Sequence, residues 1–423
     1  MSATTRTRHP FARYLRWLGT MMGVYFLLTA MLSLTVDPWR INHTPLSMDS
    51  LDSAREISGT VRVGKAALAN RGDWEAVILG SSIMEIAMDP THPAFGGRRT
   101  VNLAMAAAGV LETIPAGNYI LDRNPGIRTM VFGIDAGDLH NDFDSRKFDR
   151  FYESPFADNN ISVERTIGQL IGGRSLADSI ATIRRKFSGE APRRSPLGQW
   201  LQPNHPPDLR AYVEAAFKMG FINVSDAWAL KPQELNQEKA KLLLGYISRV
   251  RDAGISMHIV ITPHHALRQI HPVLDEPEKT CWQHHMLALI DICNKANSAP
   301  SPGPPVTLWN FMTFNTHTTT PLPAEAASSR QMPGWFDLGH AQPELGDRMI
   351  ETLLTGKPPV DREGNPYGVN LLESDWETVR RDWIAGHLSY CTENPGDVSW
   401  WRSHLAESGK NDKTPGPPAG REN

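Results

Sequence analysis

Two serines follow directly on a short apolar run, where a strand would turn into a helix. Ala76 to Leu79 reads AVIL, and Gly80, Ser81 and Ser82 come next. Small residues at such a turn let the backbone approach a ligand closely, and the first turn of the helix supplies free N–H donors. A serine in this place can be a nucleophile whose developing oxyanion is held by backbone amides. A serine that only caps the helix has the same local pattern, so this segment leaves both roles open.

An aspartate and a histidine stand three residues apart near the other end of the chain. The segment reads FDLGH, with Asp337, Gly339 and His340 shortly before a predicted helix. In a turn, the carboxylate can fold back onto the imidazole, which fixes the tautomer of the ring and supports its cationic form. The pair could therefore take a proton from a hydroxyl such as that of Ser82.

Two further segments follow predicted strands, and chemistry in open parallel sheets gathers at the carboxyl ends of strands. Asn102 begins the run NLAMAAAG, which ends at Gly109, and this loop could bring backbone N–H groups beside the serines. A tight packing turn is the alternative. His264 and His265 follow the run ISMHIVIT, and either could contact substrate or act as a second base. Solvated loop histidines are the alternative there.

No metal site and no organic cofactor are predicted. Cys281, His284, His285 and Cys293 are residue types that bind zinc. They fall in one predicted helix, in which Cys281 and Cys293 would be about 18 Å apart at about 1.5 Å per residue. That separation excludes a shared tetrahedral site and a disulfide within the helix.

The elements that must position these groups alternate between strands and helices. Short β-branched or apolar runs predict buried strands at 76–79, 100–103, 129–132, 255–262 and 306–309. Helix-like stretches lie at 111–123, 235–253, 276–297 and 344–354. Buried strands that are separated by helices indicate an α/β fold with a parallel sheet covered on both faces.

A candidate membrane anchor precedes the sheet. Residues 17–36 carry no charge, and twenty residues at about 1.5 Å each span about 30 Å, the thickness of a bilayer core. The positive-inside rule keeps residues 1–16 cytoplasmic because of their arginines, which are Arg6, Arg8, Arg13 and Arg16. A cleaved signal peptide is the main alternative, but its apolar run is normally shorter and ends in a small-residue cleavage site. A buried helix is the other alternative.

Composition sets the remaining limits. The 423 residues are 40% hydrophobic and 21% charged, which excludes wholesale disorder. The formal charge of −3 argues against a nucleic-acid partner, and three cysteines cannot form a disulfide framework. We predict a cytoplasmic N-terminus and anchor at 1–40, and a main domain at 41–356 with a helical or irregular insertion at 140–235. A helical extension at 357–404 and a disordered tail at 405–423 follow.

Taken together, these groups resemble the SGNH/GDSL hydrolase superfamily, which has a Gly-x-Ser block, a later Asn and Gly loop, and a late Asp-x-x-His. The resemblance covers about residues 75–355 and implies a three-layer, flavodoxin-like parallel sheet. It maps Ser82 to the nucleophile, His340 to the general base and Asp337 to the carboxylate that orients the base. Ser81 would take the variable middle position of the first block, and the amide of Ser82 would help line the oxyanion hole.

Two departures from the family pattern concern the oxyanion hole. In the family, a glycine of the second block donates its amide, and the nearest equivalents here, Ala107 and Gly109, are not distinguished by the sequence. The third block of the family is Gly-x-Asn-Asp, whereas residues 133–136 read GIDA, with Asp135 at the Asn position. An ionised Asp135 cannot donate to an oxyanion as Asn does, and it would oppose the negative charge unless it is protonated or turned away.

The resemblance is narrower to membrane-anchored members of cell-surface polysaccharide systems, such as those related to alginate O-acetylation and to D-alanine transfer on teichoic acid. It implies a single-pass inner-membrane protein whose main domain is periplasmic. Its activity would be that of an acyl esterase or O-acyltransferase on a surface glycan or acylated carbohydrate, with a membrane-bound acyl-donor protein as a further partner. Two alternatives stay open: a catalytically inactive assembly or glycan-binding component, and a secreted serine hydrolase whose signal is removed.

Overall fold

Strands and helices alternate along the chain. The computed structural model describes residues 10–41, 46–56, 61–140, 144–147, 151–158, 163–201, 205–218, 234–270 and 281–408. Within these residues, one sheet has the spatial order β2-β1-β3-β4-β5-β6. Its strands are β1 (Ala76–Leu79), β2 (Thr100–Asn102), β3 (Thr129–Ile134), β4 (Ser256–Ile261), β5 (Thr307–Asn310) and β6 (Val369–Asn370).

The sheet is parallel except at one edge. Strands β1 to β5 pair in parallel, and their order 2-1-3-4-5 is that of flavodoxin-type doubly wound sheets. The predicted α/β class is confirmed. The sheet is mixed rather than wholly parallel, because β6 pairs antiparallel with β5. A strand of two residues has too little periodicity to be predicted from the sequence.

Alternate side chains of each strand enter two separate apolar clusters. Val77 and Leu79 of β1 pack on one face, and Ala76 and Ile78 pack on the other. The first face is covered by α2 (Val61–Ala69), α4 (Val110–Arg123), α8 (Gln237–Asp252) and α10 (Cys281–Ser298). The second is covered by α3 (Ser82–Ala87), α7 (Leu209–Lys218), α9 (Ala266–Ile270), α11 (Pro343–Thr355) and α13 (Pro395–Ser408). Burial on both faces is the reason that the strands appear as continuous apolar runs.

The predicted helices are present with small shifts at their ends. Helices α4, α8 and α11 begin or end within two residues of the predicted bounds. Helix α10 begins at Cys281, and residues 276–280 of the predicted helix lie outside the described residues.

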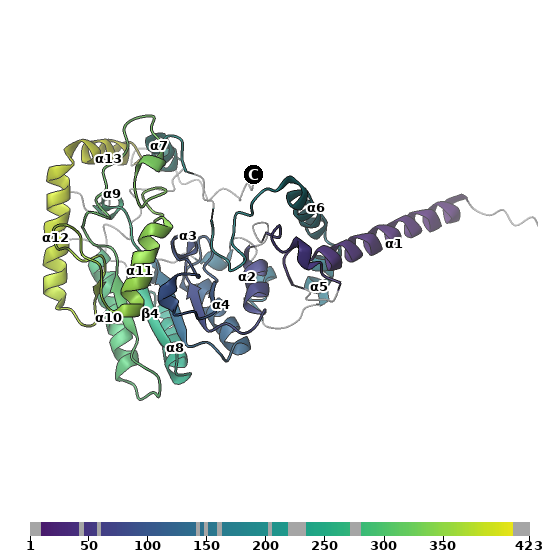
Figure 1. Cartoon of the computed structure of the whole chain (residues 1–423), viewed down its shortest axis with the longest axis horizontal. Coiled ribbons are helices and arrows are strands. Elements are labelled where there is room, and N and C mark those ends of the chain that lie inside the picture. The colour runs from purple at the N-terminus through teal and green to yellow at the C-terminus, as the bar shows by residue number, and fades with distance from the viewer. Residues whose placement is uncertain are drawn as a thin grey trace, which may run out of the picture.

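Helix α1 (Pro10–Val36) projects away from the rest of the protein (Figure 1). Among the described residues it is the helix that is long and apolar enough to span a membrane. Residues 11–28 are exposed, whereas Thr29 is buried where α1 meets α5 (Val163–Ile171) and α6 (Gly173–Ser188). Arg6 and Arg8, predicted to be cytoplasmic, lie outside the described residues.

The insertion and the C-terminal extension complete the described chain. Within the described part of residues 140–235, short helices and irregular segments occur and no strand does. The extension holds α12 (Trp376–Glu393) and α13, as the predicted helical pattern requires, but also the edge strand β6. Helix α13 continues to Ser408, past the predicted start of the tail at 405, and residues 409–423 lie outside the described residues.

Candidate active site

Ser82 is the first residue of helix α3, directly past the carboxyl end of β1. Gly80, between them, has a φ of 141°, and a Cβ there would come within 2.6 Å of Met84 Cγ. The turn therefore favours glycine over any residue with a side chain. Ser81 is the N-cap, and its Oγ accepts a hydrogen bond of 3.4 Å from a backbone amide of the first turn. Capping thus falls to Ser81, and the Ser82 hydroxyl is left for another partner.

That partner is His340, and Asp337 holds the far side of its ring. Ser82 Oγ lies 2.9 Å from Nε2 of His340, across 258 positions of sequence. Nδ1 of His340 lies 2.8 Å from Oδ2 of Asp337. The amides of Gly339 and His340 donate to Oδ1 of Asp337 at 2.7 and 2.8 Å, which forms the turn that the spacing predicts. This geometry lets the imidazole take a proton from the hydroxyl.

The electrostatics of this pair favour a proton on the imidazole. Burial by itself would raise the pKa of Asp337, but His340 and the backbone amides lower it to about 2. Burial by itself would lower the pKa of His340, but the negative charge of Asp337 outweighs it and raises that pKa. Asp337 is therefore ionised at neutral pH and stabilises an imidazolium. The His340 side chain is still 32% exposed, so a substrate can reach it.

Asp135 lies at the same edge, beside the serines. It follows β3, and its Oδ1 accepts hydrogen bonds of 2.8 Å from Ser81 Oγ and from Thr262 Oγ1. Thr262 follows β4, so three neighbouring strands, β1, β3 and β4, contribute to one polar group. Burial raises the pKa of Asp135, with hydrogen bonds from both hydroxyls acting in the opposite sense. The residue that departs from the family pattern is thus next to the Ser82–His340 pair.

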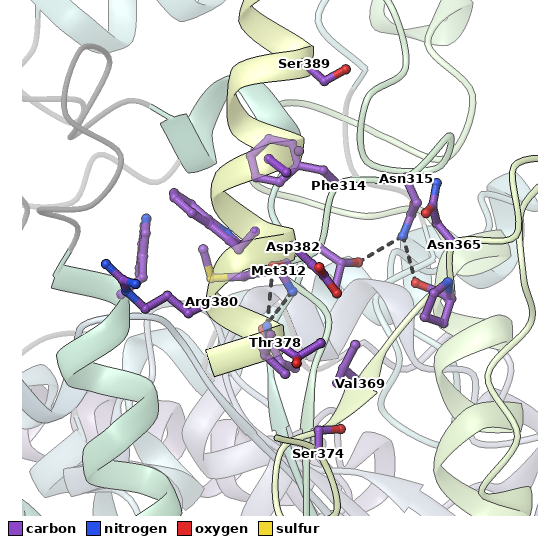
Figure 2. Close-up of a pocket in the computed structure, with 18 of the residues that line it drawn as sticks. Met312, Phe314, Asn315, Asn365, Val369, Ser374, Thr378, Arg380, Asp382 and Ser389 are labelled. Atoms are coloured by element: carbon purple, nitrogen blue, oxygen red, sulfur yellow. Dashed lines mark hydrogen bonds between the residues drawn. The ribbon is translucent and has the colours of Figure 1, made fainter. Parts of the chain in front are cut away.

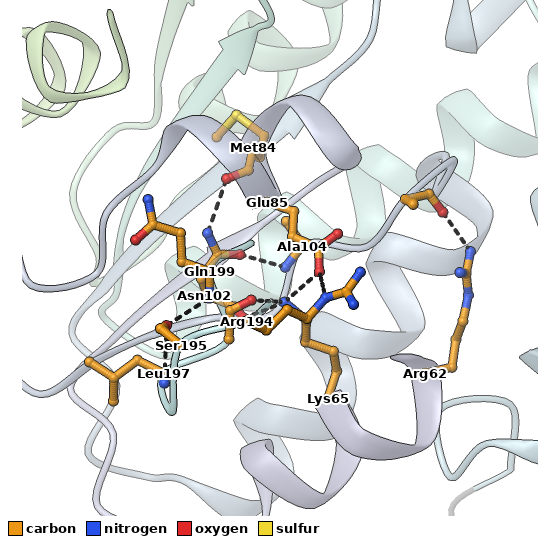
Figure 3. A network of polar contacts seen from close by, with 12 residues as sticks. Arg62, Lys65, Met84, Glu85, Asn102, Ala104, Arg194, Ser195, Leu197 and Gln199 are labelled. Atoms are coloured by element: carbon orange, nitrogen blue, oxygen red, sulfur yellow. Dashed lines mark hydrogen bonds and ion pairs between the residues drawn. The ribbon is translucent and has the colours of Figure 1, made fainter. Parts of the chain in front are cut away.

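Asn102 holds helix α3, which begins at Ser82, by hydrogen bonds to its backbone. Its buried Nδ2 donates to the backbone oxygens of Met84 and Met88, both at 3.0 Å, and its Oδ1 accepts from the amide of Ala104 (Figure 3). Both hydrogens of the amide are used by the C-terminal end of α3. The oxyanion or substrate contact predicted for Asn102 is therefore not what this geometry supports.

A buried ion network fixes the same helix (Figure 3). Oε1 of Glu85, on α3, lies 2.8 Å from Arg194 Nε and 3.2 Å from Lys65 Nζ. Lys65 also donates to the backbone oxygens of Asn102 and Gly198, at 2.9 and 2.6 Å. Burial opposes the charge of Glu85, but the two cations lower its pKa. The network ties α3 to α2, to the end of β2 and to the insertion.

The two candidates for a second oxyanion donor are distinguished by their backbone amides. The amide of Gly109 donates to Ser145 Oγ at 3.2 Å, and Gly109 caps helix α4. Ala107 has the left-handed φ of 56° that glycine favours, and its amide has no acceptor among the described residues. Ala107 therefore fits the role of second oxyanion donor better than Gly109, the other candidate from the sequence.

His264 lies near the pair but does not contact Ser82. It is buried, its Nδ1 has no hydrogen-bond partner among the described residues, and burial holds its pKa well below the usual range. His265 is also buried, with Nε2 2.7 Å from the backbone oxygen of Thr320. Neither is the solvated loop histidine that we considered, and the base role is left to His340.

A cavity of about 800 Å³ opens at the end of β5, bordered by α10 and α12 (Figure 2). Its lining mixes aromatic rings with amides and charged groups, among them Phe314, Asn315, Asn365, Trp376, Arg380 and Asp382. Trp282 also lines it, and the Trp282 and His264 ring centroids are 6.4 Å apart. No histidine is among its described lining residues, so the cavity does not contain a second serine–histidine pair. It can hold part of a ligand.

Sequence reasoning misses several of these groups. Thr262 could be found, because it is the polar residue that closes a buried apolar strand. Glu85 and Lys65 are charges inside apolar segments, which signals a buried partner without identifying it. Arg268 of α9, which acts electrostatically on both Asp337 and His340, has no signal in the sequence.

Within the described residues, no group of three or more His, Cys, Asp or Glu side chains could hold a metal ion. Cys293 is buried in the core on α10, and burial raises the pKa of its thiol to about 12. Comparison with protein-family models, curated proteins and solved structures finds no match to this chain. Function is therefore inferred from the geometry of the site itself.

Proposed function

We propose that this protein is a membrane-anchored serine esterase or O-acyltransferase of the SGNH type that acts on a cell-surface polysaccharide. The observation that carries the proposal is the hydrogen-bonded series Ser82, His340 and Asp337 at the carboxyl edge of the sheet. A serine that only capped a helix would not need an imidazole 2.9 Å from its hydroxyl, held by an ionised carboxylate.

In the proposed reaction, Ser82 Oγ attacks the carbonyl carbon of an ester while His340 Nε2 takes the hydroxyl proton. Asp337 holds the ring and stabilises the imidazolium. The amides of Ser82 and Ala107 would hold the oxyanion of the tetrahedral intermediate. When the C–O bond breaks, His340 returns the proton to the leaving alcohol, and an acyl-serine remains. Water completes an esterase cycle, and a sugar hydroxyl completes a transferase cycle.

Three features support the finer parts of the proposal. The order of strands β1 to β5, with the serine after β1 and the histidine shortly before helix α11, agrees with an SGNH-like domain. Helix α1 suits an uncleaved anchor. The arginines at positions 6, 8, 13 and 16 favour a cytoplasmic N-terminus by the positive-inside rule, and hence a periplasmic main domain. The aromatic and polar cavity at the end of β5 suits a carbohydrate, whose faces stack on rings and whose hydroxyls bind amides and carboxylates.

A fluorophosphonate probe tests the nucleophile directly. The purified full-length protein should be labelled, and Ser82→Ala should abolish the labelling, whereas Ser81→Ala should keep it. An acceptor-dependent product assay then separates hydrolysis from transfer. Absence of labelling in folded protein would contradict the proposal.

The second candidate function is a catalytically inactive, membrane-tethered assembly or glycan-binding component. Asp135 favours it, because an ionised carboxylate beside Ser81 would oppose an oxyanion. Binding of glycan without labelling of Ser82 would support this candidate.

A secreted hydrolase with a cleaved signal is distinguished by sequencing the N-terminus of the mature protein.

A further inference from the structure

The guanidinium of Arg268 lies near the Asp337–His340 pair and forms no ion pair with any described residue. Arg268 belongs to α9 and is half-buried. Its Nη1 lies 2.7 Å from the place where a Cβ of residue 339 would be, and Oδ1 of Asp337 lies 3.5 Å from the same point. The absence of a side chain on Gly339 thus makes room for the cation directly next to His340.

No described carboxylate lies within 4.0 Å of this guanidinium, and no described acceptor hydrogen-bonds to it. Three other buried or half-buried arginines are each paired with a carboxylate: Arg62 with Glu112, Arg194 with Glu85, and Arg210 with Asp397. A partly desolvated cation is costly unless an anion satisfies it. Arg268 is therefore placed to receive an anion from outside the chain.

The surroundings limit which anion fits. Asp337 is ionised, with a pKa lowered to about 2, and Arg268 is the cation that acts on Asp337 besides His340. One positive charge beside a fixed negative charge suits a monoanion better than a dianion such as phosphate. A guanidinium offers two parallel N–H groups to a planar carboxylate. Tyr212 of α7 is exposed, and the charges of Asp337 and Arg268 act on its phenol in opposite senses.

We propose that Arg268 is a carboxylate-binding subsite of the Ser82 centre, which selects esters that carry a carboxylate near the scissile bond. The inference rests on the proposed function and adds the class of its substrate. The carboxylate could belong to the acyl group, as in a dicarboxylic half-ester, or to the alcohol, as in an esterified uronic acid. In both cases the substrate charge would bind next to the imidazole that takes the serine proton.

Matched ester pairs test the subsite in the full-length protein. The acyl side is probed with 4-nitrophenyl hydrogen glutarate against 4-nitrophenyl valerate, and the alcohol side with 3-acetoxybenzoate against its methyl ester. For each pair we divide kcat/KM of the anionic ester by kcat/KM of the neutral ester. This ratio is then corrected for the rates at which the two esters hydrolyse in alkali without enzyme. We expect the ratio in one pair to fall about tenfold to a hundredfold in Arg268→Gln, and less in Arg268→Lys.

The pair that responds identifies the source of the carboxylate. Arg348→Gln is the matched control, because Arg348 is a half-buried arginine of α11 that acts on His317 and Tyr367 instead; its ratios should not change. Ratios that stay the same in Arg268→Gln while the neutral esters are still hydrolysed would overturn the subsite and leave the proposed function intact.

A binding measurement keeps the inference testable if turnover is absent. In the Ser82→Ala background, millimolar 3-acetoxybenzoate or monomethyl glutarate should raise the melting temperature of the protein, and the further change Arg268→Gln should remove that shift. No shift with either carboxylate in Ser82→Ala, together with unchanged ester ratios, contradicts the subsite. If the wild-type protein shows no Ser82-dependent turnover but the carboxylates still raise the melting temperature, the proposed enzymatic function is contradicted and the anion site is supported.

Discussion

Two charged pairs act on the segment that carries Ser82, and they differ in their exposure and in their hydrogen bonds. The Asp337–His340 pair is partly open, with side chains 16% and 32% exposed, and it leaves Nε2 for the Ser82 hydroxyl. The Lys65–Glu85 pair has no exposed side-chain surface, and the ammonium of Lys65 donates to two backbone carbonyls and lies 3.2 Å from the Glu85 carboxylate. The two pairs therefore have different roles. The Asp337–His340 pair acts on the hydroxyl of Ser82, and the Lys65–Glu85 pair holds the helix that carries Ser82.

The comparison is tested most strongly by removing the reacting atoms. Ser82→Ala and His340→Ala should each lower kcat by about ten-thousand-fold or more, because nucleophile and base act as a unit. Neither should change the circular dichroism spectrum, since both side chains lie at the partly open edge. Steady-state kinetics and thermal melts measure the two effects, and a large drop in melting temperature for His340→Ala would break the distinction.

Removing the centre of the ion network should have the opposite result. Glu85→Ala leaves Lys65 and Arg194 buried without their anion, so the free energy of unfolding should fall by about 3–5 kcal/mol. Glu75→Ala is the control, because the Glu75 side chain is 43% exposed and its partner is Arg99, whose side chain lies 3.9 Å away and whose amide donates to it at 3.0 Å. This variant should change stability by less than about 1 kcal/mol. Urea unfolding monitored by tryptophan fluorescence gives both values. Equal effects of the two variants would contradict a structural role for the network.

The open pair should also control the pH dependence of activity. His340 must be neutral to accept a proton, and its pKa is raised in the folded protein. Activity should therefore fall about tenfold per pH unit once the pH drops below that raised value, which lies above the usual 6.5. A kcat/KM profile from pH 5 to 9 measures this acidic limb, and a flat profile over that range would exclude His340 as the base.

The smallest expected effect concerns Asp135, which adjoins the open pair without belonging to it. Asp135→Asn keeps an acceptor for Ser81 and Thr262 and adds an N–H donor, so kcat should rise, by about tenfold or less. The substitution removes a charge that raises the pKa of His340, so the acidic limb should move to lower pH. Initial rates across the same pH range measure both changes. A fall in kcat would instead indicate that the carboxyl group of Asp135 serves the reaction.

Much of the scaffold could be predicted because buried parallel strands are continuous apolar runs. Strand β1 has the predicted bounds, and β2 to β5 lie within two residues of theirs. The uncharged stretch of α1 is equally visible, since length and apolarity are properties of the chain itself. Strand β6 was not predictable, because two residues become a strand only through their pairing with β5.

The candidate site divides in the same way. Ser82, Asp337 and His340 could be proposed because turns after strands and an Asp-x-x-His spacing are local patterns. The roles of Asn102 and Gly109 could not, because an amide serves whichever partner lies nearest in space. Asn102 bonds to the end of α3, 14 to 18 positions away in the sequence, and Gly109 bonds to Ser145, 36 positions away. Local spacing does not reveal such contacts.

The amino-acid sequence by itself determined the apolar strands, the uncharged N-terminal helix and the chemical types available at each turn, because these depend on neighbours along the chain. The tertiary structure alone decided which of those groups meet. The order of β1, β3 and β4 brings Ser81, Asp135 and Thr262 to one hydrogen-bonded group. Packing of α9 against the Asp337 turn places Arg268 where its charge acts on both Asp337 and His340, since the partner of a charge is set by distance in space.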